Sequence, residues 1–280
     1  MPNSTTSPVR AVGFVGLGDQ GAPWPRPWPT AASTCTPGPA THAHTAHPDV
    51  ASLIEAVDVL LLCVTDDDGV RALTGTDEAR AALRPGQVVV NHGTGDPDEN
   101  RAIAAGLATA GVHFIDAPVS GGAPGARTRT LTTMAGGDED AFTACRSVFE
   151  VYSATVAHRG PVGSGQLTKL LNNSMTMSNL ANAIDMATLA ADLGLDLTKV
   201  IAVISASSGA SASLRNLATA DPATAGHLQS LYAKDIEHFA DAMRARDLDP
   251  ARLHDRGRHA AEHLEQATRT LSRHCTGAPA

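Results

Sequence analysis

The sequence feature that most constrains the fold is a stretch of 28 residues, from Gln166 to Leu193, that contains neither proline nor glycine. Because both residue types disfavour a helix interior, their absence over this length predicts one continuous helix. At about 1.5 Å per residue the helix would extend roughly 40 Å, longer than most helices of a small domain. Such a helix is suited to connect two domains, and 280 residues are enough to form them.

Lys169 and Asn173 lie near the start of this predicted helix, four residues apart, and therefore share one helix face. The chain has three lysines, Lys169, Lys199 and Lys234, among 21 lysine and arginine residues. Lysine can lose its proton when it is desolvated and can then act as acid and base, which arginine cannot. Lys169 is thus a candidate catalytic residue, and a solvated lysine near a helix start is the equally good alternative from this stretch alone.

A second signal lies near the N-terminus, where the apolar run 11–15 leads into the sequence GLGDQG. A strand followed by G-x-G-x-x-G is typical of the first turn of a dinucleotide-binding domain, where glycines let the pyrophosphate approach the backbone. A glycine turn without a ligand is the alternative. The candidate cofactor-binding residues of this motif are Gly16, Leu17, Gly18, Asp19 and Gly21.

Residues 22–48 interrupt this pattern, because a dinucleotide site of this kind requires a helix directly after the glycines. Pro23, Pro25, Pro27 and Pro29 alternate, and each proline inside a helix costs about 3 kcal/mol, so no helix is expected. The segment also lacks the apolar β-branched run of a second strand. Either it is translated from a shifted reading frame or a faulty gene model, or it is a natural proline-rich loop that leaves the domain incomplete.

From residue 50 onward the pattern of an α/β domain returns. Apolar runs predict strands of a parallel sheet covered on both faces, at 57–64, 87–91 and 112–119. The helices expected around them lie at 49–56, 97–110 and 138–149. Ligands of such sheets bind beyond the carboxyl ends of the strands, which makes Val64 and Thr65 candidates for cofactor contact. The loop 92–97 follows the second of these strands.

The string DAPVSGG, residues 116–122, follows the third of these strands. A serine hydroxyl and glycine N–H groups can hold a carboxylate without obstruction by side chains. Ser120, Gly121 and Gly122 are therefore candidate substrate-binding residues, with a plain strand-to-loop turn as the alternative.

Taken in order, these motifs resemble the β-hydroxyacid dehydrogenase family, which includes 3-hydroxyisobutyrate dehydrogenase and related 6-phosphogluconate dehydrogenase-like enzymes. The resemblance covers about 11–21 and 50–253. In the loop after the second predicted strand, Thr94 matches the family's threonine and Gly93 replaces its usual serine. The other motifs that carry the resemblance are the DAPVSGG string, the spacing of Gly160, Gly163, Gly165, Lys169 and Asn173, and the sequence Lys234-Asp235-Ile236.

The resemblance implies an α/β fold, with a Rossmann-type domain at 9–162 and an all-α domain at 163–280, joined by the long helix. It implies NAD or NADP as cofactor and a small β-hydroxy acid as substrate. Lys169 would be the general acid and base with Asn173 beside it, while Thr94 and Lys234 would contact the cofactor. A homodimer or homotetramer is expected on the same ground.

Two alternatives stay open. Imine reductases share this architecture but generally lack a lysine at the position of Lys169, which favours hydroxy-acid chemistry. The second alternative is a non-catalytic remnant that folds but no longer holds a dinucleotide, because of residues 22–48. The choice between NAD and NADP also depends on that segment and stays open.

Composition excludes several other functions. The formal net charge of −8 argues against nucleic acid as a partner. The four cysteines are scattered without metal-ligand spacing and are expected to be free thiols, and no metal site is predicted. No signal peptide and no apolar run near 18 residues is present, so no membrane partner and a cytoplasmic location are expected.

Overall fold

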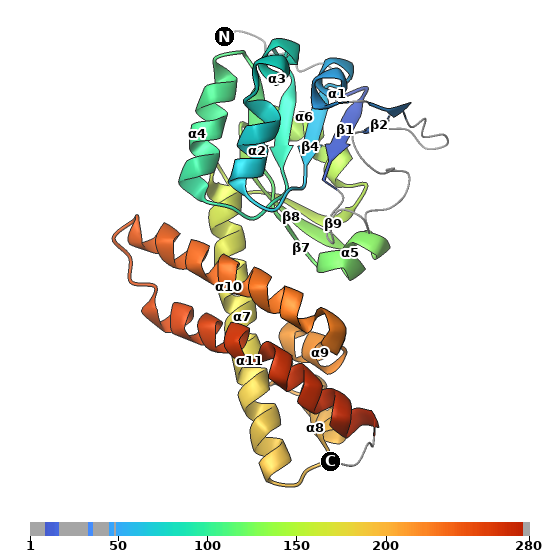
Figure 1. Cartoon of the computed structure of the whole chain (residues 1–280), viewed down its shortest axis with the longest axis vertical. Coiled ribbons are helices and arrows are strands. Elements are labelled where there is room, and N and C mark those ends of the chain that lie inside the picture. The colour runs from blue at the N-terminus through green and yellow to red at the C-terminus, as the bar shows by residue number, and fades with distance from the viewer. Residues whose placement is uncertain (1–8, 17–32, 36–44, 48, 277–280) are drawn as a thin grey trace. The chain divides into compact units, whose positions relative to one another are not determined.

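The computed structural model describes residues 9–16, 33–35, 45–47 and 49–276. The chain divides into two compact units, Met1–Lys169 and Leu170–Ala280, and the division falls inside helix α7, Ser164–Asp192 (Figure 1). This 29-residue helix is the uninterrupted helix that the sequence predicts. The domain boundary predicted between residues 162 and 163 lies just before α7 begins.

In its described residues the first unit is built on a nine-stranded sheet in the order β3-β2-β1-β4-β5-β6-β8-β7, with β9 paired to β8. Strands β1, β4, β5 and β6 run parallel to one another, whereas β6 and β8 are antiparallel. The strands are β1 Val12–Val15, β2 Ser33–Cys35, β3 Thr45–Ala46, β4 Val59–Leu62, β5 Val88–Asn91, β6 His113–Asp116, β7 Val119–Ser120, β8 Leu131–Gly137 and β9 Ser153–His158.

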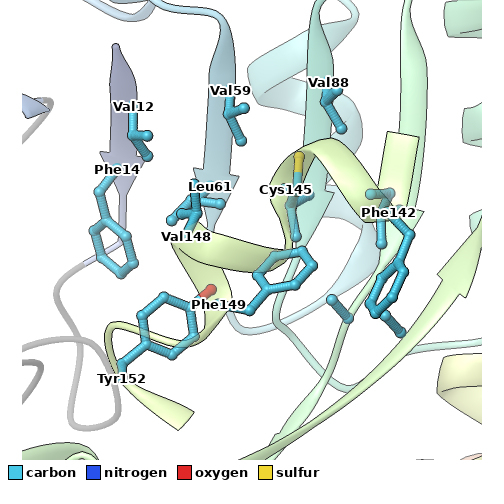
Figure 2. Packing of buried hydrophobic residues seen from close by; sticks show 14 of the residues in the cluster. Val12, Phe14, Val59, Leu61, Val88, Phe142, Cys145, Val148, Phe149 and Tyr152 are labelled. Carbon is cyan, nitrogen blue, oxygen red and sulfur yellow. The ribbon is translucent and has the colours of Figure 1, made fainter. Parts of the chain in front are cut away.

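Helices cover both faces of the parallel strands, as the continuous apolar runs predict. Successive residues of a strand point to opposite faces, so Val59 and Leu61 of β4 pack on one side and Leu60 and Leu62 on the other. The first side packs against α6, where Phe142, Cys145 and Phe149 contact the sheet (Figure 2); the second packs against α1 to α4. The helices of this unit are α1 Val50–Ala56, α2 Asp67–Thr74, α3 Asp77–Ala82, α4 Pro97–Ala108, α5 Gly122–Thr128 and α6 Glu139–Phe149.

One expectation is wrong for the part of the sheet that lies beyond β1. No second strand is expected within 22–48, but β2 pairs with β1 in antiparallel orientation and β3 pairs with β2. Short strands at an edge need little apolar sequence, because main-chain hydrogen bonds to a neighbour are enough to align them. The apolar run that the prediction requires is needed only for strands buried on both faces.

The second unit contains the remainder of α7 and, among the described residues, four further helices. Helices α10 and α11 pack against each other, and α8 and α9 pack against α11. Their contacts bury mostly alanine and other aliphatic side chains with Phe239, which agrees with the low aromatic content. In the described part of the chain, no helix has both the length and the apolar character needed to span a membrane. The helices are α8 Leu197–Ser205, α9 Ala212–Ala218, α10 Pro222–Arg244 and α11 Ala251–Thr276.

Candidate functional site

The carboxyl ends of the four parallel strands lie side by side. Register pairs Val15 with Leu62, Leu62 with Asn91, and Asn91 with Asp116, so the loops that follow these residues begin at one edge of the sheet. Gly16, directly after β1, has a φ of +105°, and a Cβ there would lie 2.1 Å from the carbonyl oxygen of Cys63. Only glycine therefore fits where the chain leaves β1 beside the end of β4.

The loop after β5, residues 92–96, is held by buried polar side chains. We call it the Thr94 loop. Asn91 accepts a hydrogen bond from the Gly93 N–H at 2.9 Å, and the Asp67 carboxylate accepts one from the Asp96 N–H at 2.7 Å. The side chain of Asn100 donates to Asp67 at 2.9 Å, and Asn91 in turn donates to Asn100 at 2.9 Å. The two ends of the loop are therefore fixed by one connected network.

The start of α7 is attached to the same edge of the sheet. Asp116, the last residue of β6, accepts hydrogen bonds from the N–H groups of Gly163 at 2.8 Å and Gln166 at 2.7 Å. Burial raises the pKa of Asp116 to about 7, while these N–H groups act in the opposite direction. The Gln166 side chain is buried and bonds the Thr94 loop, donating to the Gly93 carbonyl at 2.8 Å and accepting from the Gly95 N–H at 3.0 Å.

His92, at the start of the Thr94 loop, is buried in an aromatic environment. One ring nitrogen, Nδ1, lies 2.7 Å from the Ala117 carbonyl oxygen, and Nε2 lies 3.1 Å from the Tyr152 hydroxyl. Burial lowers the pKa of His92 to about 4, so the ring is neutral at pH 7. Because a carbonyl only accepts, Nδ1 carries the proton and Nε2 accepts from Tyr152. The neutral imidazole thus connects the end of β5 to the end of β6.

The predicted substrate-binding residues lie at the turn from β7 to α5. Ser120 is half-buried and ends β7, while Gly121 and Gly122 are exposed. Gly121 has a φ of +126° and Gly122 a φ of +57°. Positive φ at both positions is by itself a reason for two consecutive glycines. Gly121 and Gly122, which have no side chains, therefore follow directly after Ser120 and its hydroxyl group.

Lys169 is the last residue of the first unit and is half-buried. It lies three residues after Gln166 on α7, so the two side chains occupy the same side of the helix, one turn apart. The cofactor candidates Val64 and Thr65 follow β4, and Thr94 is half-buried between two buried glycines. A Cβ at Gly93 would lie 2.7 Å from the Val64 carbonyl oxygen, which shows how closely these two loops approach.

Asn173 and Lys234 belong to the second unit, where Asp235 contacts both. The Asn173 side chain donates to the Asp235 carboxylate at 2.7 Å, and the Lys234 Nζ lies 3.8 Å from the other carboxylate oxygen. The amide of Asn173 is therefore oriented with its nitrogen toward Asp235. Asp235 stands beside Lys234 in the motif already noted in the sequence, but no role was predicted for it.

Four predicted cofactor-binding residues, Leu17, Gly18, Asp19 and Gly21, lie outside the described residues. Among the described side chains Cys63 and Cys145 are free thiols, and burial raises the pKa of each to about 12. Within the described ranges, no three His, Cys, Asp or Glu side chains come together as a possible metal site.

The residues that hold the Thr94 loop were not predicted from the sequence. Gln166 could have been found, because it precedes Lys169 by one helical turn on the same side. Asp116 was noted as part of the DAPVSGG string but without its bonds to α7. No local signal points to His92 and Tyr152, since 60 residues separate them.

Two family models together match most of the chain. Residues 29–160 match the NAD binding domain of 6-phosphogluconate dehydrogenase, and residues 163–271 match the NAD-binding domain of NADP-dependent 3-hydroxyisobutyrate dehydrogenase. An uncharacterized oxidoreductase of Shewanella frigidimarina is 36% identical over 57% of this chain, which spans 55% of that relative. An uncharacterized oxidoreductase of Mycobacterium tuberculosis is 32% identical over 69% of this chain and 68% of the relative.

Solved structures share the fold. A Mycobacterium tuberculosis 3-hydroxyisobutyrate dehydrogenase with L-serine superposes with a TM-score of 0.72 at 23% identity, covering 93% of this chain and 98% of that one. A Pseudomonas imine reductase superposes with a TM-score of 0.58 at 17% identity, covering 94% of this chain and 98% of the other. Both likenesses concern the fold alone.

The chain belongs to the β-hydroxyacid dehydrogenase family of NAD(P)-dependent oxidoreductases. Its cofactor class is NAD or NADP. The described part of the site fits a dinucleotide, because the loops after β1, β4 and β5 begin at one edge of the parallel sheet, where such ligands bind. The fold class predicted from the sequence is confirmed.

Proposed function

We propose that the protein transfers a hydride reversibly between a nicotinamide cofactor and a small β-hydroxy acid, as a 3-hydroxyisobutyrate dehydrogenase-like enzyme. The observation that supports this most is the attachment of the start of α7 to the Thr94 loop and to the end of β6. Asp116 of the DAPVSGG string accepts bonds from the backbone of Gly163 and Gln166, and the Gln166 side chain bonds both sides of Thr94. Lys169 follows Gln166 by three residues on the same helix.

Each residue would have a defined task. Gly16, Val64, Thr65 and Thr94 would hold the dinucleotide, which when bound supplies or accepts the hydride. The Ser120 hydroxyl and the N–H groups after it would hold the substrate carboxylate. These contacts would orient the carbon that carries the hydroxyl group and keep it in place.

Lys169 would move the proton. In the direction of reduction its ammonium group would donate a proton to the oxygen that becomes the hydroxyl, and in oxidation the neutral amine would remove that proton. Asn173 would orient the hydroxyl or the lysine, and Asp235 would hold the Asn173 amide, with which it shares a 2.7 Å hydrogen bond. Lys234 would contact the cofactor. We further propose that the protein acts in the cytoplasm as a homodimer or homotetramer.

The first test is binding and turnover by the wild-type protein. Titration with NADH and with NADPH should change the nicotinamide fluorescence. With NAD⁺ or NADP⁺ as the hydride acceptor, 3-hydroxyisobutyrate and L-serine, both β-hydroxy acids, should then be oxidised. Silence with both cofactors would contradict the proposal and favour a remnant without dinucleotide binding. Turnover of cyclic imines but not of hydroxy acids would favour imine reductase chemistry.

The second test concerns the proton. Lys169→Ala should lower turnover by about 10²- to 10⁴-fold, the usual contribution of a general acid or base. Lys169→Arg should be nearly as slow, since arginine keeps the charge but does not give up a proton. Lys199→Ala is the matched control, because the Lys199 side chain is 83% exposed and pairs with Asp196 in α8's first turn. Unchanged turnover in Lys169→Ala would refute the assignment.

A further inference from the structure

We propose that Gln166 is the positioning residue of the Thr94 loop, fixing the peptide groups on both sides of Thr94 to the helix that carries Lys169. The inference rests on the proposed function, because the place of Thr94 matters to the reaction only if the nicotinamide binds beside it. It assigns to Gln166 a part in cofactor binding and turnover, and not only in stability.

The contacts of Gln166 reach both the Thr94 loop and the end of β6. Its side-chain nitrogen donates to the Gly93 carbonyl at 2.8 Å, and its side-chain oxygen accepts from the Gly95 N–H at 3.0 Å. Its backbone N–H donates to Asp116 at the end of β6, at 2.7 Å. The residue thus connects the loop after β5 and the last residue of β6 through three hydrogen bonds.

The chemistry of the site requires an amide. One atom of the side chain must donate to a carbonyl and the other must accept from an N–H, and a carboxamide provides both at neutral pH. An ionised glutamate can only accept, and would place a charge against the Gly93 carbonyl. Methionine has a similar length but can form neither bond.

The loop depends on these bonds because of its own sequence. Glycine is conformationally permissive, and Thr94 stands between two of them. Side chains cannot stiffen the loop at these positions, since a Cβ would lie 2.7 Å from the Val64 carbonyl oxygen at Gly93 and 2.2 Å from the Asp67 carboxylate at Gly95. Hydrogen bonds from Gln166 therefore fix the conformation of the Thr94 loop, which side-chain packing at the two glycines cannot do.

Gln166 also fixes the position of the Thr94 loop relative to α7. Lys169 follows Gln166 by three residues on this helix, so the residue that fixes Thr94 and the proposed acid and base belong to one rigid helical segment. Loss of the two side-chain bonds should loosen the Thr94 loop and its alignment with Lys169 together. We therefore expect weaker cofactor binding and slower turnover in the same variant.

The decisive variant is Gln166→Glu, measured against pH. At pH 8 the ionised side chain should raise the dissociation constant for the cofactor that the wild type binds more tightly, NADH or NADPH, about tenfold, the effect of one buried hydrogen bond of ordinary strength. Burial raises the pKa of a carboxyl group, so lowering the pH to 6 should protonate the side chain and restore a donor toward Gly93. The ratio of the variant's dissociation constant to that of the wild type should therefore decrease with falling pH. A constant ratio near one would overturn the inference.

A matched pair separates positioning from stability. Gln87 is also buried and also binds main-chain atoms, donating to the carbonyls of Ile54 and Val57 at 2.7 Å each, but it precedes β5 instead of following it. Gln87→Met and Gln166→Met should lower the melting temperature to a similar extent. Only Gln166→Met should raise the dissociation constant for that cofactor and lower kcat, each about tenfold.

The possible results separate a failure of the proposed function from a failure of the role of Gln166 alone. Wild-type protein that binds neither cofactor would overturn the proposed function and the role of Gln166 with it. Wild-type turnover together with an unchanged Gln166→Met, or an equal loss of binding in Gln87→Met, would overturn the role of Gln166 alone. If Gln166→Met does not fold, the pH dependence of Gln166→Glu decides.

Discussion

Polar side-chain contacts join distant segments in both units of this molecule, but they are buried in the first unit and exposed in the second. In the first unit, Asp67 and Asn100 hold the Thr94 loop from positions that are 7% and 0% exposed. In the second unit, Asp185 of α7 pairs with Arg256 of α11 at 3.1 Å, through side chains that are 44% and 38% exposed. Both pairs join segments that are far apart in the sequence.

The difference teaches that burial, more than the number of bonds, decides what such contacts contribute. When a buried donor or acceptor loses its partner it stays desolvated, which costs about 1–3 kcal/mol for each group. When an exposed ion pair is broken, water solvates both members and the loss is small. The Thr94 loop should therefore be sensitive to single substitutions, and the α7–α11 contact should tolerate them.

The largest effect is expected for Asp67→Ala. The substitution removes the acceptor of the Asp96 N–H and of one Asn100 N–H, while the Asn100 side chain keeps its bond to the Asp96 carbonyl at 2.8 Å. It should lower the free energy of unfolding by about 3 kcal/mol. Urea denaturation followed by circular dichroism measures it. Asp68→Ala is the neighbouring control, since the Asp68 side chain is 84% exposed and pairs with Arg71. Equal losses in the two variants would refute the argument from burial.

Acid should destabilise the first unit through His92. Its folded pKa of about 4 is below the unfolded value of about 6.5, so the folded protein binds fewer protons in this range. The stability that the neutral ring contributes is present above pH 6.5 and is lost as pH falls toward 4, with about 2 kcal/mol lost by pH 5.

Asp116 acts in the opposite direction, because its raised pKa of about 7 makes the folded protein bind a proton as pH falls from 7 to 5, which stabilises the fold. The loss through His92 is therefore measured against a variant, by urea denaturation at pH 7 and pH 5. His92→Gln has no charge at either pH, so its free energy of unfolding relative to that of the wild type should be about 2 kcal/mol higher at pH 5 than at pH 7. His113→Gln, at a half-buried position in β6, should show the pH dependence of the wild type. The same pH dependence in His92→Gln as in the wild type would show that another group is responsible.

For Gly93→Ser the family resemblance and the structure give opposite expectations. Gly93 stands where the family usually has serine, so the resemblance alone predicts that the substitution is harmless. The Cβ would lie 2.7 Å from the Val64 carbonyl oxygen, and we expect a loss of about 1–2 kcal/mol. Gly106→Ala in α4 has nothing within 4 Å of the new Cβ and should gain about 0.5–1 kcal/mol. A stabilised Gly93→Ser would show that the loop adapts.

The smallest effect is expected in the second unit. Arg256→Ala removes one of two partners of Asp185, whose other carboxylate oxygen stays 2.8 Å from His259 Nε2. The substitution should cost less than about 1 kcal/mol, with a smaller cost at high salt. Urea denaturation at low and at about 0.5 M salt provides the test. A loss as large as that of Asp67→Ala would remove the contrast between the two regions.

Much of the fold could be predicted because its signals are local. The apolar runs at 57–64 and 87–91 contain β4 and β5, and Pro97 begins α4 as expected. Helices α2, α3 and α5 were not predicted, since they are short, at six to eight residues, and show no long apolar period. The edge strands β2 and β3 were wrongly excluded, because a pattern that describes buried strands was applied to an edge.

The sequence by itself determined strands β4, β5 and β6, helices α1, α4 and α6, the glycines at 121 and 122, and the long α7 with Lys169 near its start. These follow from properties of neighbouring residues: side-chain period, proline and glycine, and motif spacing. Only the tertiary structure decided that Gln166 holds both sides of Thr94, that Asp116 binds the start of α7, and that His92 is neutral beside Tyr152. Those partners lie 50 to 73 residues apart, and strand order and register decide which distant groups meet.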